Sequence, residues 1–267
     1  MSIYKESQAQ IEPAIQSILS QTFQDFEMVI VLDCPENKNA ETYLNDLSCN
    51  HKNITIIKNE KNIGLGASLN KAIEVANGEY IARMDTEDTS HYQRFEKQVA
   101  YLDSNPDTHL LFTQWQEEFT DGSTQVRAPK STDVQNITKY FFIKSILLHP
   151  TLMARAQVLK DNPYPEISRP EDFVLFLELM KKNYSFRLIE EVLYTYKIDT
   201  TEKYEKVRTY SKNLLPYLFK NVPYFWHNIL FWFYFLRIFI EFCISRNKFV
   251  FGHLHKIAAK IWKMLFK

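Results

Sequence analysis

The sequence predicts an α/β protein, with a mainly parallel sheet flanked by helices and a helical appendage at the C-terminus. Over the first 100 residues, apolar runs of strand length alternate with segments of helical periodicity, which is typical of a parallel sheet with right-handed crossovers. Two of these runs end in carboxylates, as strands do at the ligand-binding edge of an open sheet. An aromatic-rich stretch begins at Val222, so we expect one domain over residues 1–198 and a helical region over 199–267.

The composition limits the class of protein. With 267 residues, 45% of them hydrophobic, the chain can bury a full core. Lys+Arg and Asp+Glu both number 32, so the net charge gives no reason to expect a nucleic-acid partner. Cys34, Cys49 and Cys243 form no CxxC pair, and their odd number indicates free thiols in a reducing compartment rather than a disulfide framework or a zinc site.

The first elements alternate between helix and strand. The periodicity predicts a helix over residues 8–20, a buried strand over 27–33, a helix over 40–47 and a strand over 53–58. Asp33 is the last residue of the buried strand. Only Met1 to Tyr4 precede the first helix, where a doubly wound sheet normally has a strand, so either the first strand is a stub or the true start lies upstream.

A polar loop with Gly64 and Gly66 leads into the next helix, for which we expect Asn77-Gly78 as the C-cap. The glycine pair is not a dinucleotide fingerprint, because a third glycine is missing and the pair follows a loop. A helix-entry turn is favoured over a flexible backbone that approaches a ligand.

The central segment is a strand that starts at Glu79, breaks at Asp85, Glu87 and Asp88, and restarts as a helix. Three acids within four residues repel one another unless a cation joins them. Mg²⁺ or Mn²⁺ takes one or two carboxylates and completes its shell with water and phosphate oxygens, so one interpretation is a divalent-metal site that holds a nucleoside diphosphate. The alternative is a solvated acidic turn in which Asp88 or Ser90 caps the helix.

The second half of the chain continues with a strand over 109–116, a hairpin near Asp121-Gly122, a helix over 133–142 and a late strand over 186–197. His149 lies between an apolar run and a proline, where a packed or hydrogen-bonded loop histidine is favoured over a ligand. A further helix begins at Pro170, with Glu171 and Asp172 in its first turn. Acids at that position are expected on helix-dipole grounds alone.

Taken together, these segments resemble the family 2 glycosyltransferases with a GT-A (Rossmann-like) fold, particularly the bacterial enzymes of capsule, exopolysaccharide and lipopolysaccharide assembly. The resemblance covers residues 2–198 and rests on six pieces in the family's order. They are Ser17-Ile-Leu-Ser-Gln-Thr22, the strand end at Asp33, the loop Asn62-Ile-Gly-Leu-Gly-Ala-Ser-Leu-Asn70, Arg83-Met-Asp-Thr-Glu-Asp88, His149-Pro-Thr151 and Glu171-Asp172.

The resemblance implies a role for each matching residue. It implies that Asp33 accepts hydrogen bonds from the nucleobase, that Asp85 lies against uridine or ribose, and that Asp88 and Glu87 reach a Mn²⁺ or Mg²⁺ ion on the diphosphate. Asp172 would be the general base in a single displacement that inverts the anomeric carbon. Tyr4, Asn62 and Gly64 would complete the donor site, and His149 and Glu171 would lie on the acceptor side.

The chain departs from the family pattern at several positions. Glu87 stands where the family usually has aspartate, which moves the carboxylate one methylene further out. The family's first strand is mostly absent. Lys5 and Phe176 replace a usual asparagine and a frequent tryptophan.

The sequence of the C-terminal region predicts a helix that lies in the membrane interface. The uncharged run ends at Arg237, short of the ~20 residues needed to cross a bilayer. A narrow polar stripe is expected at His227, Tyr234, Arg237, Glu241, Ser245 and Lys248, with aromatic residues around the rest. The last segment gathers lysines 256, 260, 263 and 267 on one face, which would attract an anionic leaflet. The first alternative is a helical subdomain that packs on the catalytic domain or on a second subunit, and a transmembrane span is the next.

The resulting hypothesis is an inverting glycosyltransferase that moves a sugar from a nucleotide-diphosphate donor, expected to be a UDP-sugar, to a hydroxyl of a lipid-linked or surface-polysaccharide acceptor. It would lie peripherally on the cytoplasmic face of the bacterial inner membrane, and homo-oligomer formation stays open. The rival hypothesis is a catalytically weak nucleotide-sugar-binding or assembly subunit, since the first strand is short and Glu87 replaces aspartate.

Overall fold

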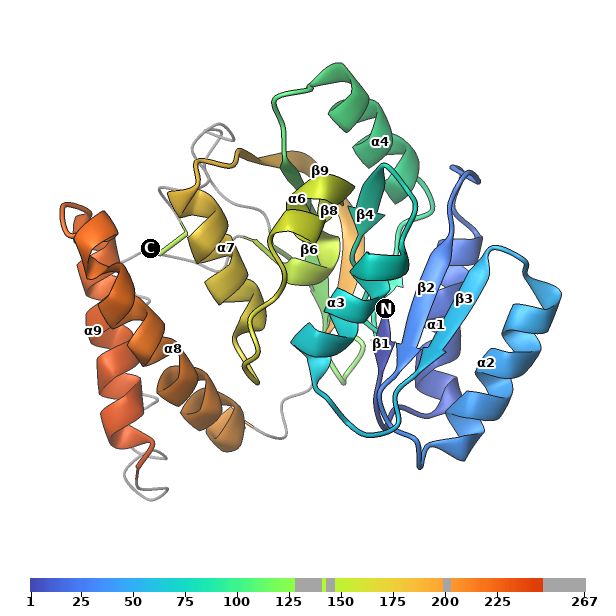
Figure 1. The fold of residues 1–267 in the computed structure, drawn as a ribbon, viewed down its shortest axis with the longest axis horizontal. Helices are drawn as coiled ribbons and strands as arrows, with labels where there is room; N and C mark the ends of the chain where they lie inside the picture. The colour runs from blue at the N-terminus through green and yellow to red at the C-terminus, as the bar shows by residue number, and fades with distance from the viewer. Residues whose placement is uncertain (128–140, 143–146, 199–202, 247–267) are drawn as a thin grey trace.

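A computed structural model describes residues 1–127, 141–142, 147–198 and 203–246 of the chain (Figure 1). Two sheets stand next to each other, and helices cover them. The α/β fold class is confirmed, and the sheets together are mixed rather than mainly parallel. Among the described residues, three strand pairs are parallel and four are antiparallel.

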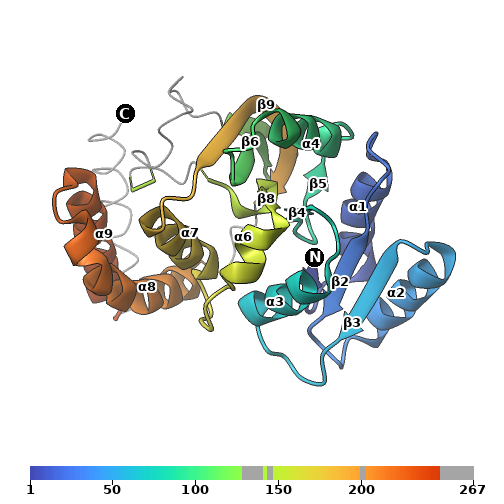
Figure 2. The same ribbon diagram turned by 45° about the horizontal axis from the view of Figure 1, so that its top comes forward.

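The first sheet has the order β1-β2-β3 and is parallel throughout. Its strands are β1 (Ser2–Ile3), β2 (Met28–Leu32) and β3 (Ile54–Lys58), and its helices are α1 (Gln8–Leu19), α2 (Lys38–Asn50) and α3 (Leu65–Val75). Figures 1 and 2 show β2 and β3 between α3 on one side and α1 and α2 on the other. Because both faces are covered, β2 reads as a continuous apolar run.

The second sheet has the order β4-β8-β6-β9-β5, and β7 pairs with β6. Its strands are β4 (Tyr80–Ala82), β5 (Thr89–Ser90), β6 (Leu110–Glu118), β7 (Thr124–Arg127), β8 (Met153–Arg155) and β9 (Phe186–Lys197). Its helices are α4 (Arg94–Ser104), the 3₁₀ turn η2 (His149–Thr151), α6 (Ala156–Asp161) and α7 (Glu171–Lys181). The predicted hairpin is confirmed, and Gly122 at its turn has a φ of 79°.

Three predictions about local structure are not confirmed as they were made. The helix predicted over residues 40–47 starts earlier, at Lys38, because the Asn37 side chain caps it by accepting from the Ala40 N–H. The Asn77-Gly78 C-cap is wrong: α3 ends at Val75, and the Asn77 and Gly78 N–H groups donate to the Glu27 carboxylate. The helix predicted over 133–142 lies outside the described residues, apart from a turn at 141–142.

The C-terminal region forms two helices, α8 (Lys203–Phe225) and α9 (Ile229–Ile244), that pack on α7. One apolar cluster contains Leu175 and Phe176 of α7, Leu214 of α8 and Phe231 of α9. The rings of Phe173 and Tyr234 stack with centroids 5.1 Å apart. The domain boundary at residue 198 stays a prediction, and the apolar core continues across it.

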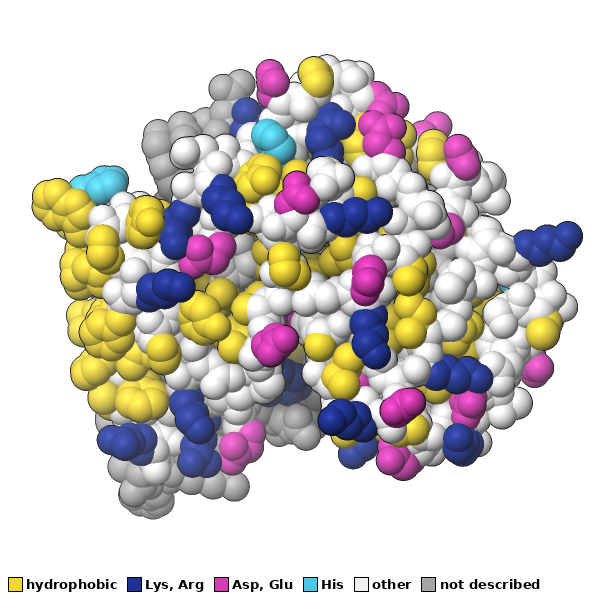
Figure 3. Space-filling model, viewed as in Figure 1, with side chains coloured by type: hydrophobic (Ala, Val, Ile, Leu, Met, Phe, Trp, Pro, Cys, Tyr) yellow, Lys and Arg dark blue, Asp and Glu magenta, His cyan; other side chains and the backbone are white. Residues whose placement is uncertain are grey.

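The orientation of α9 is the reverse of an ordinary surface helix. Tyr234, Glu241 and Ser245, which belong to the predicted polar stripe, are buried against the protein. The outward face is apolar: Trp232, Phe233, Leu236, Phe239 and Ile240 are 41–54% exposed. Figure 3 shows hydrophobic side chains gathered over this helix. Within the described residues, no helix has the length and apolar character needed to span a membrane.

Candidate active site

Asp33, at the end of β2, fastens the loop that leads into α3. One carboxylate oxygen accepts from the Asn59 side chain at 2.8 Å and from the Ile63 N–H at 2.9 Å, and the other accepts from the Gly64 N–H at 2.9 Å. Gly64 has a φ of 87° and is the N-cap of α3, so the helix-entry turn is confirmed. Asp33 is 3% exposed and organises the 59–64 loop.

Two residues that sequence reasoning missed extend this network. The Asn59 side chain also donates to the Ser68 hydroxyl, and the Lys71 ammonium of α3 donates to the side-chain amide oxygen (Oδ1) of Asn59 at 2.7 Å. Asn59 directly follows β3, so its position at the carboxyl edge of the sheet was the available signal. Together these contacts bring a lysine to the same edge as Asp33.

Asn62 belongs to the 59–64 loop, and Tyr4 directly follows β1. Tyr4 is exposed, and its carbonyl oxygen accepts from the Asn37 side chain at 3.1 Å. The Asn62 side-chain oxygen accepts from the Gly64 N–H at 2.9 Å, so both Asn62 and Asp33 hold that amide. Their donor-binding roles stay predictions.

Asp85 pairs with Arg83 at the end of β4. Arg83 is buried and Asp85 is partly exposed, so the Asp85 carboxylate contacts the buried guanidinium on one side and solvent on the other. Burial alone would lower the pKa of Arg83, but the Asp85 carboxylate raises it and keeps the guanidinium charged. The Arg83 Nε has no hydrogen-bond partner among the described residues.

Asp88 is 2% exposed and is held by the end of β9. One of its oxygens accepts from the Tyr194 hydroxyl at 2.9 Å and the other from the Lys197 N–H at 2.9 Å. Burial, together with the charge of Asp85, raises the pKa of Asp88 to about 7. The two carboxylates therefore repel each other, and a cation bound to them would relieve that repulsion.

Glu87 turns towards another element. Its carboxylate accepts a hydrogen bond from the Gln10 side chain on α1. No group of three His, Cys, Asp or Glu side chains in the described ranges could hold a metal ion alone. Mg²⁺ or Mn²⁺ requires only one or two carboxylates when a diphosphate supplies the other oxygens, so the donor set fits a cation at Asp85 and Asp88. A metal role for Glu87 stays a prediction.

Asp172 stands in the first turn of α7, and one of its oxygens accepts from the Phe173 N–H at 2.7 Å. Burial raises the pKa of Asp172 to about 6, and the charges of Glu171 and Asp85 add to the shift. Asp85 therefore lies within electrostatic range of both Asp88 and Asp172. Glu171 is buried, and its carboxylate accepts from the Arg169 N–H at 3.0 Å.

His149 is a buried, hydrogen-bonded residue, as the first interpretation of the sequence expected. Its Nε2 lies 2.7 Å from the Tyr164 hydroxyl. Burial, together with Arg83, lowers its pKa well below the ordinary value, so the ring is neutral. Tyr164, which sequence reasoning missed, exchanges two backbone hydrogen bonds with the Asn70 side chain and thereby ties His149 to α3.

Arg169 connects the segment before Asp172 to the C-terminal helices. It adopts a φ of 54°, which is unusual for a residue other than glycine. The Asn213 side chain of α8 donates to the Arg169 carbonyl oxygen at 2.9 Å and also to that of Ser168. The segment before Asp172 is thus held by a residue from outside the predicted 1–198 domain.

Comparisons with known proteins bear on this geometry. A family model described as glycosyl transferase family 2 matches residues 1–159. An uncharacterised glycosyltransferase of Methanocaldococcus jannaschii is 36% identical over 239 residues, which cover 87% of this chain and 82% of the relative. The amylovoran biosynthesis glycosyltransferase AmsE of Erwinia amylovora is 29% identical over 196 residues, 72% of this chain and 73% of the relative.

A solved structure has the same fold. The crystal structure of Staphylococcus aureus TarS 1-349 in complex with UDP-GlcNAc matches with a TM-score of 0.64 at 19% identity, over 94% of this chain and 72% of that chain. The chain spans 38% of a longer TarS structure. Similarity at this level supports the fold assignment.

Proposed function

Because this chain belongs to glycosyl transferase family 2, we propose that it moves one sugar from a UDP-sugar to a hydroxyl of a lipid-linked or surface-polysaccharide acceptor, with inversion at the anomeric carbon. The observation that carries the proposal is the position of Asp85, whose charge raises the pKa of Asp88 on one side and adds to the raised pKa of Asp172 on the other. Departure of the nucleoside diphosphate from the donor requires stabilisation of its negative charge. Attack by the acceptor hydroxyl requires a base close to the diphosphate.

The donor side of the proposal rests on Asp85 and Asp88. Bound Mn²⁺ or Mg²⁺ would be held by these carboxylates and would stabilise the negative charge on the departing diphosphate. Glu87, one methylene longer than aspartate and held by Gln10, lies beside them in the chain. The preference for uridine is supported by TarS, whose structure contains UDP-GlcNAc, and by an Escherichia coli relative named as a UDP-Gal transferase.

The acceptor side of the proposal rests on Asp172. A carboxyl group whose pKa is raised to about 6 is a stronger base than an ordinary aspartate and is still mostly ionised at neutral pH. It would take the proton from the acceptor hydroxyl as that oxygen attacks the anomeric carbon. One direct displacement inverts the centre and needs no covalent intermediate. A lipid-linked acceptor is supported by the Escherichia coli relative, whose name specifies a diphosphoundecaprenol acceptor.

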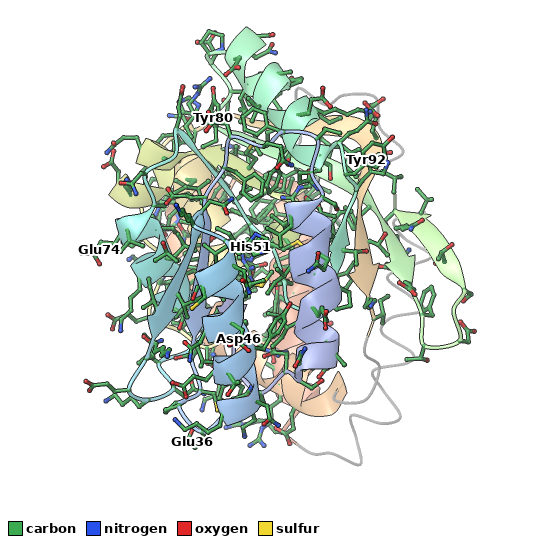
Figure 4. The ribbon with its side chains drawn as sticks, turned by 90° about the vertical axis from the view of Figure 1, so that its right-hand side faces the viewer. Glu36, Asp46, His51, Glu74, Tyr80 and Tyr92 are labelled. Atoms are coloured by element: carbon green, nitrogen blue, oxygen red, sulfur yellow. The ribbon has the colours of Figure 1, made fainter. Side chains whose placement is uncertain are left out.

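The first experiment is calorimetric titration of UDP into the purified chain with and without Mn²⁺, repeated on Asp88→Ala. We expect binding that depends on Mn²⁺ and is lost in the variant. The matched control is Asp46→Asn, since Asp46 is an exposed aspartate on α2, on the outer surface that Figure 4 faces. A folded wild-type chain that binds no UDP under either condition would favour the rival function, a weak binding or assembly subunit.

The proposal includes peripheral attachment to the cytoplasmic face of the cell membrane through α9. Its outward aromatic and aliphatic face, beside the exposed Lys220 of α8, has the composition of a helix that lies in the membrane interface. Free cysteines at positions 34, 49 and 243 are compatible with a reducing compartment. A lipid-linked acceptor would then lie at the surface that the protein binds.

This attachment is tested by sedimentation with anionic and neutral vesicles. We expect the protein to sediment with the anionic vesicles, and the double variant Leu236→Ser and Phe239→Ser to stay in solution. Val126→Ser is the control, since Val126 is equally exposed but lies on β7. Equal sedimentation of the wild type and the double variant would exclude the outward face of α9 as the membrane-binding surface. Concentration-dependent dimers lost only in the double variant would assign it to a second copy of the chain.

A further inference from the structure

A fully buried arginine on α4 binds the backbone of the segment that leads to Asp85. Arg94, the first residue of α4, and Gln98, one turn later, are both 0% exposed. The Arg94 Nε donates to the Gln98 side-chain oxygen at 2.9 Å, so the two side chains form one unit. Arginine and glutamine are seldom fully buried, so both side chains must find partners inside the protein.

Arg94 replaces a ladder hydrogen bond at the point where β4 leaves its sheet. Past the last β4–β8 pair, the Arg83 N–H still donates to the Leu152 carbonyl oxygen at 2.8 Å. The Leu152 N–H does not return this bond, because it donates to the His149 carbonyl oxygen and closes the turn η2. Instead, the Arg94 Nη2 donates to the Arg83 carbonyl oxygen at 3.0 Å and to the Leu152 carbonyl oxygen at 3.2 Å. The carbonyl group that the ladder leaves over is thereby paired.

Gln98 has the same effect on the other side of β8. Its Nε2 donates to the Leu111 carbonyl oxygen of β6 at 3.2 Å and to the Thr151 carbonyl oxygen of η2 at 3.0 Å. The β6–β8 ladder ends at the pair Leu111–Met153, so Gln98 joins the two chains just past that pair. Two side chains of one helix therefore fix the end of β4, the end of the β6–β8 ladder and the turn η2 relative to one another.

Stability alone does not explain the charge of Arg94. Within the described ranges, its guanidinium forms an ion pair with no carboxylate, and its Nη1 has no hydrogen-bond partner. Burial lowers the pKa of Arg94 to about 10, so the group is still charged at neutral pH. A buried cation loses its hydration, and an apolar side chain of similar volume would often be as stable. The position of Arg94 is therefore better explained by what its side chain holds in place.

The segment that Arg94 holds carries the donor-side carboxylates. Arg83 lies two residues before Asp85, whose N–H donates to the Tyr194 hydroxyl at 3.3 Å. That hydroxyl donates to the Asp88 carboxylate at 2.9 Å, and the Arg94 guanidinium lies 5.3 Å from the centre of the Tyr194 ring. The segment is thus held at its start by Arg94, and at both aspartates by Tyr194.

We propose that Arg94 and Gln98 are positioning residues for the donor side of the site: they fix the Arg83 carbonyl group and thereby place Asp85 relative to Asp88, so that the two carboxylates can hold a divalent cation on a diphosphate. This inference rests on the proposed function, in which these carboxylates bind the cation. Carboxylates that share a cation must keep one separation and orientation, so a shift of the strand end would weaken binding. Both residues act through the backbone.

The test compares Arg94→Met with Arg155→Met. Arg155 is the matched control, because its guanidinium also donates to backbone carbonyl groups, but at the C-terminal end of α4 and just after it, namely those of Leu102, Asn105 and Thr108. Both variants should lower the thermal unfolding midpoint. Only Arg94→Met should weaken calorimetric binding of UDP in the presence of Mn²⁺, by about 10- to 100-fold. It should also change the ratio of the UDP affinities measured in Mn²⁺ and in Mg²⁺.

Two milder variants keep the test decisive if Arg94→Met does not fold. Arg94→Lys retains a donor for the carbonyl oxygens of Arg83 and Leu152, and Gln98→Met leaves those two bonds in place. We expect both variants to fold and to weaken Mn²⁺-dependent UDP binding by about 2- to 10-fold, which corresponds to the loss of one hydrogen bond. The ratio of the affinities in Mn²⁺ and Mg²⁺ should shift in the same direction as in Arg94→Met.

Hydrogen exchange gives a measurement that needs no ligand. Exchange at the amides of residues 83–88 should be faster in the Arg94 variants than in Arg155→Met. Unchanged UDP affinity in the Arg94 and Gln98 variants would overturn this inference and leave the proposed function intact. A similar loss of UDP affinity in Arg155→Met would also overturn it, since both arginines would then act through stability alone. A folded wild-type chain that binds no UDP would contradict the proposed function and, with it, the donor-side role of Arg94.

Discussion

The Asn213 side chain of α8 donates a hydrogen bond to the carbonyl oxygen of Arg169 across 2.9 Å, three residues before Asp172. The same amide reaches the Ser168 carbonyl, and Glu171 accepts from the Arg169 N–H, so the backbone of this segment is held from two sides. Arg169 keeps a left-handed backbone conformation only because neighbouring groups fix it. The C-terminal helices thus take part in positioning the proposed catalytic base.

Loss of this link should weaken catalysis and leave UDP binding intact. Each lost hydrogen bond is worth about 1 kcal/mol, and Asn213 makes two, so Asn213→Ala should lower kcat/KM for the acceptor by about 5- to 30-fold. Lys212→Ala, the exposed neighbour on the same helix, is the control. Steady-state kinetics with varied acceptor, beside calorimetry with UDP, would measure both effects. An unchanged kcat/KM would limit Asn213 to a structural role.

Removal of the carboxylate at position 172 should abolish transfer. A positioned general base contributes about 10²–10⁴-fold, so Asp172→Asn should lower kcat by that range. UDP binding should stay within about twofold, because the proposal assigns Asp172 to the acceptor and not to the donor. Product formation from a radiolabelled UDP-sugar would measure the rate. A UDP affinity that falls along with kcat would place Asp172 in the donor site instead.

The pH profile of transfer should report the protonation of Asp172. A base acts when ionised, and its pKa is raised to about 6, so kcat should rise with pH through this value and then level off. The charge of Glu171 contributes to the shift, so Glu171→Gln should move the acidic limb to lower pH. The amide can still accept from the Arg169 N–H. An unshifted limb in Glu171→Gln would assign the titration to another group.

Local patterns in the sequence were enough to predict the elements that carry the site. The run 28–32 is apolar on both faces and ends in Asp33, the glycine at position 64 marks the entry to α3, and Pro170 precedes α7 directly. These features depend on neighbouring residues, which periodicity and turn chemistry describe well. The α/β fold class followed from them.

Partners far apart in the sequence could not be predicted in this way. Tyr194 and Asp88 are separated by 106 residues, and Gln10 and Glu87 by 77 residues. Such pairs depend on how the sheets assemble, which no local pattern contains. Periodicity also defines the faces of α9 without saying which one turns inward, and in the structure Tyr234, Glu241 and Ser245 of the predicted polar stripe are buried, whereas His227 of that stripe is exposed.

In metal-free buffer, the protein should lose stability as the pH rises through neutrality. Burial and Asp85 raise the native pKa of Asp88 from 3.8 to about 7, so the folded state holds a proton that the unfolded chain releases. The stabilisation is complete below about pH 4 and is lost as the pH rises through 7. A shift of this size corresponds to roughly 2–4 kcal/mol, or about 5 °C or more in the unfolding midpoint.

Asp88→Asn should flatten the profile of the unfolding midpoint against pH between pH 5 and 8, measured by thermal unfolding in metal-free buffer. Mn²⁺ with UDP should raise the wild-type midpoint more at pH 8 than at pH 5, because the cation binds the ionised carboxylate. A wild-type midpoint that stays constant over this range in metal-free buffer would mean that Asp88 is ionised throughout, and that the repulsion from Asp85 is already relieved by groups of the protein.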